Sequence, residues 1–223
     1  MIAFSGLLFD LDGTLLDTAP DFVTSINSLL SRHKRAHLDF DLIRNRVSDG
    51  SASLLELAFN VTPIDLNFDT LQNELLTLYL EHLGDNTKIF PHIDQILTEC
   101  DQRALPWGVV TNKPWMYTER LLKRLNLINR ARCVICSDHV KKPKPHPESL
   151  QLGSMHLNVK IDECIYIGDH SRDILAAKNA KMRSIVAAWG YINKHEDISC
   201  WNADWIALTP KKLFNLLFKE LEY

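Results

Sequence analysis

The stretch FDLDGTL, residues 9–15, places two carboxylates, Asp10 and Asp12, directly after an apolar run at residues 7–9. Uninterrupted apolar runs are typical of strands that are covered on both faces, as in a parallel sheet. Side chains two positions apart at a strand end lie on one side, and two carboxylates there repel each other unless a cation lies between them. The stretch favours a Mg²⁺ site in which one carboxylate attacks phosphorus and the other transfers a proton. An Asp-Gly turn with solvated carboxylates is the alternative.

Apolar runs and amphipathic helical patterns alternate along the rest of the chain. Further apolar runs lie at 107–110, 133–136, 164–167 and 184–188. Helical patterns lie at 92–102, 114–126, 147–157, 171–181 and 210–221. This alternation predicts an α/β fold with a doubly wound, Rossmann-like parallel sheet and right-handed crossovers. Ligands of such sheets bind beyond the carboxyl ends of the strands.

Residues 18–85 depart from this alternation, because only helical patterns occur there, at 19–32, 51–60 and 66–83. A block of this length is too long for a simple connection between a strand and a helix. We therefore expect an inserted helical domain with its own small core. The predicted domains are an α/β core from residues 1–17 and 86–223, and a helical domain from residues 18–85.

Polar residues follow the other apolar runs. Thr111 and Asn112 come directly after the run at 107–110, where a hydroxyl and backbone N–H groups can hold a phosphoryl oxygen or cap a helix. Asp169 lies where it can bind a metal. Asp173 lies four residues later, at a position where an acidic residue also stabilises the start of a helix. Each signal alone has an ordinary structural explanation.

The loop KKPKPHP, residues 141–147, interleaves three prolines with basic residues. Because proline is excluded from the interior of helices and strands, this loop is expected to be stiff and to present one ammonium group at a fixed position. That charge can neutralise a phosphate that faces Asp10, although a solvated basic turn is the alternative. Gly13 and Thr14 permit a sharp turn and offer N–H donors to phosphate oxygens. Together the clusters form a coherent set for phosphoryl transfer through an aspartyl-phosphate.

Composition narrows the functional classes. The chain has 223 residues, of which 46% are hydrophobic and 24% charged, as in soluble globular proteins. With a net charge of −3, the chain lacks the excess of basic residues that favours binding to nucleic acid or an anionic membrane. No apolar stretch approaches the ~20 residues that a bilayer requires, so we expect a cytoplasmic protein. Cys133 and Cys136 have CxxC spacing, but their apolar surroundings favour a buried strand over a redox or zinc site.

Taken in order, these clusters make the chain resemble the haloacid dehalogenase superfamily of phosphohydrolases over essentially its whole length. The resemblance implies a phosphatase in which Asp10 is the nucleophile and Asp12 the general acid and then base. It implies phosphate binding by Thr111 and by a lysine of the 141–147 loop. The family's Lys-Pro-x-Pro pattern fits both Lys142 and Lys144, and the spacing of the preceding residues favours Lys144.

The resemblance also implies a cofactor and a substrate site. Mg²⁺ is expected to be held by Asp10, Asp12, Asp169 and Asp173. The residues expected to contact the substrate are Gly13, Thr14 and Asn112 of the core and Arg44, Asp49 and Gly50 of the helical insertion, which resembles the family's mobile cap. The substrate itself is expected to be a small molecule, and the protein a monomer or homodimer.

Within the superfamily, the stretches DGTLLDTAP (12–20), WGVVTNKP (107–114) and AWGY (188–191) are similar to phosphoglycolate phosphatase-like members. The nearer resemblance is to a bacterial branch that includes N-acetylmuramic acid 6-phosphate phosphatases. The implied substrate is therefore 2-phosphoglycolate or N-acetylmuramic acid 6-phosphate. A sugar-phosphate mutase on the same scaffold is one alternative, and a phosphorylatable receiver domain, which acts as a binding switch, is another.

Overall fold

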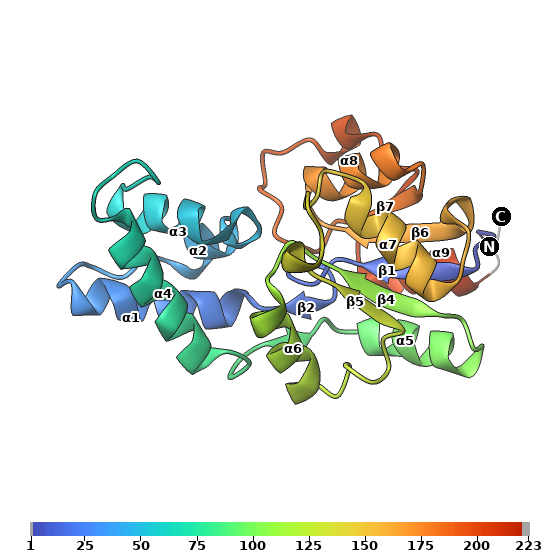
Figure 1. Ribbon diagram of the computed structural model, residues 1–223, viewed down its shortest axis with the longest axis horizontal. Helices are drawn as coiled ribbons and strands as arrows, with labels where there is room; N and C mark the ends of the chain where they lie inside the picture. Colours follow the sequence, from blue (N-terminus) through green and yellow to red (C-terminus); the bar gives the residue numbers. More distant parts are fainter. Residues whose placement is uncertain (1, 220–223) are drawn as a thin grey trace. The chain divides into compact units, whose positions relative to one another are not determined.

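The apolar runs form a six-stranded parallel sheet in the computed structural model, which describes residues 2–219 (Figure 1). The order of strands across the sheet is β5 (Cys133–Ile135), β4 (Trp107–Val110), β1 (Gly6–Phe9), β6 (Cys164–Gly168), β7 (Arg183–Ala187) and β8 (Trp205–Ala207). Every neighbouring pair is parallel. The predicted α/β fold class is thus confirmed.

Burial explains which strands the sequence pattern could predict. Leu7, Leu8 and Phe9 of the central strand β1 are fully buried, because the sheet is covered on both faces. The edge strand β8 has only three residues, and its Ile206 is 42% exposed. Its apolar run is short and lies at an exposed edge of the sheet, so this strand was not among those predicted from the sequence.

Helices cover both faces of the sheet. They are α5 (Ile93–Gln102), α6 (Trp115–Arg124), α7 (Glu148–Leu157), α8 (Ser171–Ala180) and α9 (Pro210–Phe218), with the short helices η2 (Ser137–His139), η3 (Ile161–Glu163) and η4 (Ile198–Trp201). On one face α7 contacts β1, β4 and β5, and α8 contacts β6 and β7. Figure 1 shows α5, which contacts α9, on the other side. The expected last residues of the final helix, 220 and 221, lie outside the described residues.

The order of the strands creates a switch point beside β1. From β1 the chain proceeds to β4 and β5 on one side, and then returns to β6, β7 and β8 on the other. At such a reversal the connections leave the carboxyl ends of the central strands uncovered, which is where ligands of open α/β sheets bind. The carboxyl ends of β1, β4 and β6 are therefore the expected place of the site.

The chain divides into two compact units, and residues Asp17–Lys88 form the second. Its helices are α1 (Ala19–Arg32), α2 (Phe40–Arg44), η1 (Val47–Asp49), α3 (Gly50–Phe59) and α4 (Phe68–His82). The unit has its own core, in which the rings of Phe22 and Tyr79 stack at 3.9 Å. Both ends of the unit fall within β2 (Leu16–Asp17) and β3 (Lys88–Ile89), which pair as a two-stranded sheet. Among the described helices none has the length and apolarity that crossing a bilayer demands.

The five cysteines predict a simple pattern of chemical labelling. All are free thiols, and burial raises the pKa of Cys100 and Cys133 to about 12 and of Cys136 and Cys164 to about 11. Cys200 is exposed. Hydrogen bonding to Asp197 raises the pKa of Cys200 as well, but its thiol is accessible, so a disulfide reagent at about pH 8 should label Cys200 first and the other four only on unfolding. Cys200→Ser should abolish the fast phase, and fast labelling of a second thiol would contradict the burial described here.

Candidate active site

The ends of three neighbouring strands bring the candidate residues together. Asp10 directly follows β1, Thr111 follows β4 and Asp169 follows β6. The N–H group of Asp10 donates to the carbonyl of Ile167 at 2.8 Å, so the ladder between β1 and β6 continues into the site. Regular sheet backbone therefore positions the side chains.

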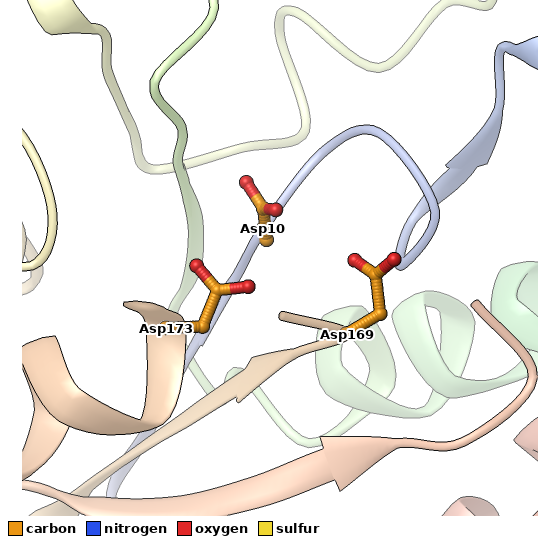
Figure 2. A group of neighbouring side chains, drawn as sticks. All are labelled: Asp10, Asp169 and Asp173. Atoms are coloured by element: carbon orange, nitrogen blue, oxygen red, sulfur yellow. The ribbon is translucent and has the colours of Figure 1, made fainter. Parts of the chain in front are cut away.

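Asp10, Asp169 and Asp173 form a carboxylate cluster, shown in Figure 2. Each contributes an oxygen, and these oxygens lie within 4.8 Å of one another. Burial, followed by the charges of Asp10 and Asp173, raises the pKa of Asp169 to about 8. Burial also raises the pKa of Asp173, although the ammonium of Lys144 opposes that shift. The positive charges near the cluster therefore do not fully balance the negative charge of its three carboxylates.

A hard divalent cation fits the carboxylate cluster. Carboxylate oxygens are ligands that Mg²⁺ prefers, and a cation among them would offset their mutual repulsion. Within the described part of the chain, this is the group of acidic, histidine or cysteine side chains that could hold a metal. The carboxylate of Asp12 is not part of the cluster, so any contribution from Asp12 to metal binding stays a prediction.

Close packing orients the Asp169 carboxylate. The Thr14 hydroxyl donates to its Oδ1 at 2.9 Å, and the N–H of Tyr191 donates to its Oδ2 at 2.8 Å. A Cβ atom at Gly13 or Gly190 would overlap with Asp169, and Gly13 also has a φ of +83°, which favours glycine. The Thr14 side chain thus orients Asp169, a role that the sequence analysis did not assign to it.

Lys144 lies at the centre of the buried charges. Its Nζ is 2.8 Å from Asp10 Oδ1 and 2.8 Å from Asp173 Oδ1, and its side chain is 1% exposed. Burial alone lowers the pKa of this ammonium, but the two carboxylates outweigh burial and raise it. Lys142 is exposed on the surface. Of the two lysines that fit the sequence pattern, the structure therefore places Lys144 in the site.

Tyr166 of β6 is a site residue that the sequence analysis missed. Its hydroxyl donates to the carbonyl of Val110 at 2.8 Å and accepts a hydrogen bond from Lys144 Nζ at 2.6 Å. Burial raises the pKa of Tyr166 well above its usual value, so the hydroxyl stays neutral. Nothing in the sequence distinguishes this tyrosine from an ordinary apolar strand residue. Its role depends on its contact with Lys144, which only the folded chain brings about.

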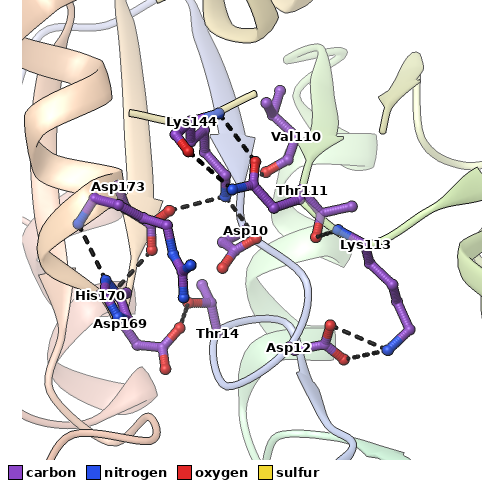
Figure 3. Close-up of polar contacts among 12 residues, drawn as sticks. Asp10, Asp12, Thr14, Val110, Thr111, Lys113, Lys144, Asp169, His170 and Asp173 are labelled. Carbon is purple, nitrogen blue, oxygen red and sulfur yellow. Dashed lines mark hydrogen bonds and ion pairs between the residues drawn. The ribbon is translucent and has the colours of Figure 1, made fainter. Parts of the chain in front are cut away.

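A second ion pair joins Asp12 to Lys113. The two side chains lie apart from Lys144 and its carboxylates in Figure 3, with Lys113 Nζ at 3.0 and 3.1 Å from the two oxygens of Asp12. The Lys113 side chain is 5% exposed and that of Asp12 is 17% exposed. Lys113 lies within the stretch 107–114, where no role was predicted for it from the sequence. The signal that could have found it is its position two residues after Thr111 at a strand end.

Thr111 and Asn112 organise the backbone around the site. Thr111 is buried, and its hydroxyl accepts a hydrogen bond from the N–H of Lys113 at 3.1 Å. The Asn112 side chain donates to the carbonyl of Lys144 at 2.9 Å and accepts from its N–H at 3.0 Å. Asn112 therefore positions the lysine loop, and its expected contact with substrate stays a prediction.

The three substrate-contact candidates of the helical insertion lie in the second unit. Arg44 ends α2, Asp49 ends η1, and Gly50 begins α3 with a φ of +84°. They are close together in the sequence and in the same turn-rich stretch. Their role in substrate binding stays a prediction.

Metal binding should depend on pH. In the metal-free folded protein the pKa of Asp169 is about 8, whereas the ordinary value is 3.8. Between these values the folded state binds a proton that the unfolded chain lacks, so stability should fall as the pH rises through this range. Mg²⁺ competes with that proton and binds the folded state. Calorimetry should show that Mg²⁺ raises Tm more at about pH 8 than at about pH 6.

The control for this measurement is Asp169→Asn. That variant keeps the shape of the side chain but removes one carboxylate, so the Tm increase on adding Mg²⁺ should be largely lost. A wild-type Tm that is indifferent to Mg²⁺ at both pH values would contradict metal binding by the carboxylate cluster.

Known proteins share this sequence pattern. The family model described as haloacid dehalogenase-like hydrolase matches residues 7–187. An N-acetylmuramic acid 6-phosphate phosphatase from Pseudomonas aeruginosa is 34% identical over 215 residues, which cover 96% of this chain and 95% of that protein. A phosphoglycolate phosphatase from Xanthomonas campestris pv. campestris is 36% identical over 208 residues, which cover 93% and 94%.

Solved structures share the fold. The crystal structure of a predicted phosphoglycolate phosphatase from Haemophilus somnus has a TM-score of 0.85 at 22% identity, covering 97% of this chain and 99% of that one. CbbY from Rhodobacter sphaeroides, crystallised with phosphate, has a TM-score of 0.75 at 20% identity, covering 94% and 96%. At these identities the likeness concerns the fold alone.

Proposed function

This chain belongs to the haloacid dehalogenase-like hydrolase family, and on that premise we propose that it hydrolyses small phosphomonoesters through a phosphorylated Asp10, with Mg²⁺ as cofactor. The observation that supports this proposal most strongly is the convergence of Asp10, Asp169, Asp173 and Lys144 at one edge of the sheet. A carboxylate that faces an ammonium and a fitting cation site suits attack on a phosphate dianion.

The cofactor fits the carboxylate cluster. Asp10, Asp169 and Asp173 are the residues that would hold Mg²⁺. When bound, Mg²⁺ supplies positive charge that neutralises phosphate oxygens and favours attack by an anion. Lys144 and Thr111 are assigned to the remaining phosphoryl oxygens, since Lys144 contacts Asp10 and Thr111 directly follows β4, the strand next to β1.

The proposed reaction has two steps. Asp10 attacks phosphorus, the bond from phosphorus to the leaving oxygen breaks, and Asp12 gives its proton to that oxygen. A water molecule then attacks the phosphorus of the aspartyl-phosphate while Asp12 takes up its proton, which releases phosphate and regenerates Asp10. Asp12 lies outside the carboxylate cluster, and its partner Lys113 stabilises the carboxylate that remains once Asp12 has given up its proton.

We assign the second unit, Asp17–Lys88, the role of a cap that recognises the leaving group. Its turn-rich stretch with Arg44, Asp49 and Gly50 supplies charged groups and backbone N–H donors of the kind that bind a polar alcohol. Closure of such a cap would exclude water during the first step. The substrate is proposed to be 2-phosphoglycolate or N-acetylmuramic acid 6-phosphate. Relatives carrying both names match the chain at 34–36% identity, so identity does not separate them.

A phosphate-release screen tests the proposed function. The purified protein with Mg²⁺ is offered 2-phosphoglycolate, N-acetylmuramic acid 6-phosphate, hexose phosphates and nucleoside monophosphates. We expect one of the first two to give the highest kcat/KM, and chelation of the metal to abolish turnover. Equally weak release from all four classes would contradict both named substrates. Isomerised sugar phosphate without free phosphate would instead identify a mutase.

A further inference from the structure

Lys113 is a buried cation to which the proposed reaction assigns no direct part. Its Nζ contacts both oxygens of Asp12, at 3.0 and 3.1 Å, and its side chain is 5% exposed. The N–H of Lys113 donates to the Thr111 hydroxyl, so the stem of the side chain starts from a fixed point at the end of β4. Figure 3 shows this pair as a separate assembly from Lys144.

We propose that Lys113 is a positioning residue that orients Asp12 for proton transfer to the leaving group. This inference rests on the proposed function. In the first step the bond between phosphorus and the leaving oxygen breaks, the proton of Asp12 passes to that oxygen, and Asp12 becomes a carboxylate. The ammonium of Lys113 lies where it stabilises that carboxylate and holds it in place to accept a proton from water in the second step.

The charges around the site support a dedicated partner for Asp12. Lys144 contacts Asp10, Asp173, Tyr166 and Val110, whereas Lys113 contacts Asp12. An ion pair that is mostly removed from water gains little net stability, because desolvation offsets much of the attraction. Contact with both oxygens does, however, restrict rotation of the carboxylate. Orientation of Asp12 is therefore the property that Lys113 supplies.

Leaving groups that differ in their need for a proton provide the test. An alkyl phosphate expels an alkoxide, which needs the proton of Asp12, whereas p-nitrophenyl phosphate expels a phenolate that leaves unprotonated. The parameter kcat/KM reports steps through the first irreversible one. For Lys113→Met we expect kcat/KM to fall about 10- to 100-fold with 2-phosphoglycolate and with 2-hydroxyethyl phosphate. With p-nitrophenyl phosphate the fall should be less than about threefold.

Companion variants make the result specific. Lys113→Arg should recover most of the kcat/KM that Lys113→Met loses. Asp12→Asn should show the same dependence on the leaving group. The double variant Lys113→Met, Asp12→Asn should have nearly the same kcat/KM as Asp12→Asn alone. Lys123→Met, which removes an exposed lysine of α6, is the matched control. Should Lys113→Met fail to fold, Lys113→Gln replaces it. For that variant we also expect kcat/KM to fall more with the alkyl phosphates than with p-nitrophenyl phosphate.

The outcomes separate the two proposals. If the wild type releases phosphate from no ester, the proposed function fails. If the wild type is active and Lys113→Met lowers kcat/KM equally with alkyl and aryl esters, the function stands and the positioning role of Lys113 is overturned. A loss confined to 2-phosphoglycolate, with 2-hydroxyethyl phosphate unaffected, also overturns it, because Lys113 would then bind the substrate carboxylate.

Discussion

Replacement of Asp10 by asparagine is expected to lower phosphate release by at least ~10⁴-fold, the scale seen when an enzyme loses its nucleophile. The amide has nearly the same shape as the carboxylate but is not nucleophilic towards phosphorus. It also removes one negative charge from the carboxylate cluster, so Mg²⁺ binding should weaken. Steady-state release of phosphate from the best substrate of the screen measures the effect.

The same substitution should not unfold the protein. Asp10, Asp169 and Asp173 repel one another in the metal-free state, and the loss of one charge relieves that repulsion. Lys144 loses Asp10 as an ion partner but keeps Asp173, so we expect the metal-free Tm of Asp10→Asn to equal or exceed that of the wild type. Asp162→Asn, at an exposed residue before β6, is the matched control and should retain full activity. Turnover by Asp10→Asn at the wild-type rate would falsify the proposed aspartyl-phosphate.

Replacement of Lys144 by methionine is expected to reduce both activity and stability. The variant keeps most of the length of the side chain but leaves the carboxylates of Asp10 and Asp173 without their ammonium partner. Breaking a buried ion pair from one side costs about 3–5 kcal/mol. Loss of a charge that faces the phosphoryl group should lower kcat ~10²–10³-fold. Urea unfolding and phosphate release measure the two effects.

Lys142→Met is the internal control, because it makes the same change two residues away in the same loop. Lys142 is exposed, so neither the free energy of unfolding nor kcat should change appreciably. The opposite pattern, with Lys142→Met inactive and Lys144→Met active, would show that the loop adopts another arrangement during catalysis. Added Mg²⁺ should recover part of the stability that Lys144→Met loses, because the cation offsets the same carboxylates.

The local sequence pattern was sufficient to predict the strands of the core and the acidic residues that follow them. The uninterrupted apolar runs predicted β1, β4, β5, β6 and β7, because strands covered on both faces consist mostly of apolar residues. Asp10, Thr111 and Asp169 could be predicted as site candidates because each follows such a run, and parallel strands bring their carboxyl ends to one edge. The strand β8 and the short helix α2 were missed, since β8 is a short edge strand with an exposed Ile206 and the five residues of α2 show too little periodicity.

Strand ends, the helical insertion and the order of the acidic residues are thus properties of the linear chain. Which ammonium meets which carboxylate is a property of the folded molecule. Lys144 reaches Asp10 across 134 positions, and Lys113 reaches Asp12 across 101. No local spacing encodes such pairs, because they depend on the register and order of strands in the sheet. The choice between Lys142 and Lys144, and the part played by Tyr166, were therefore decided only when the strands came together.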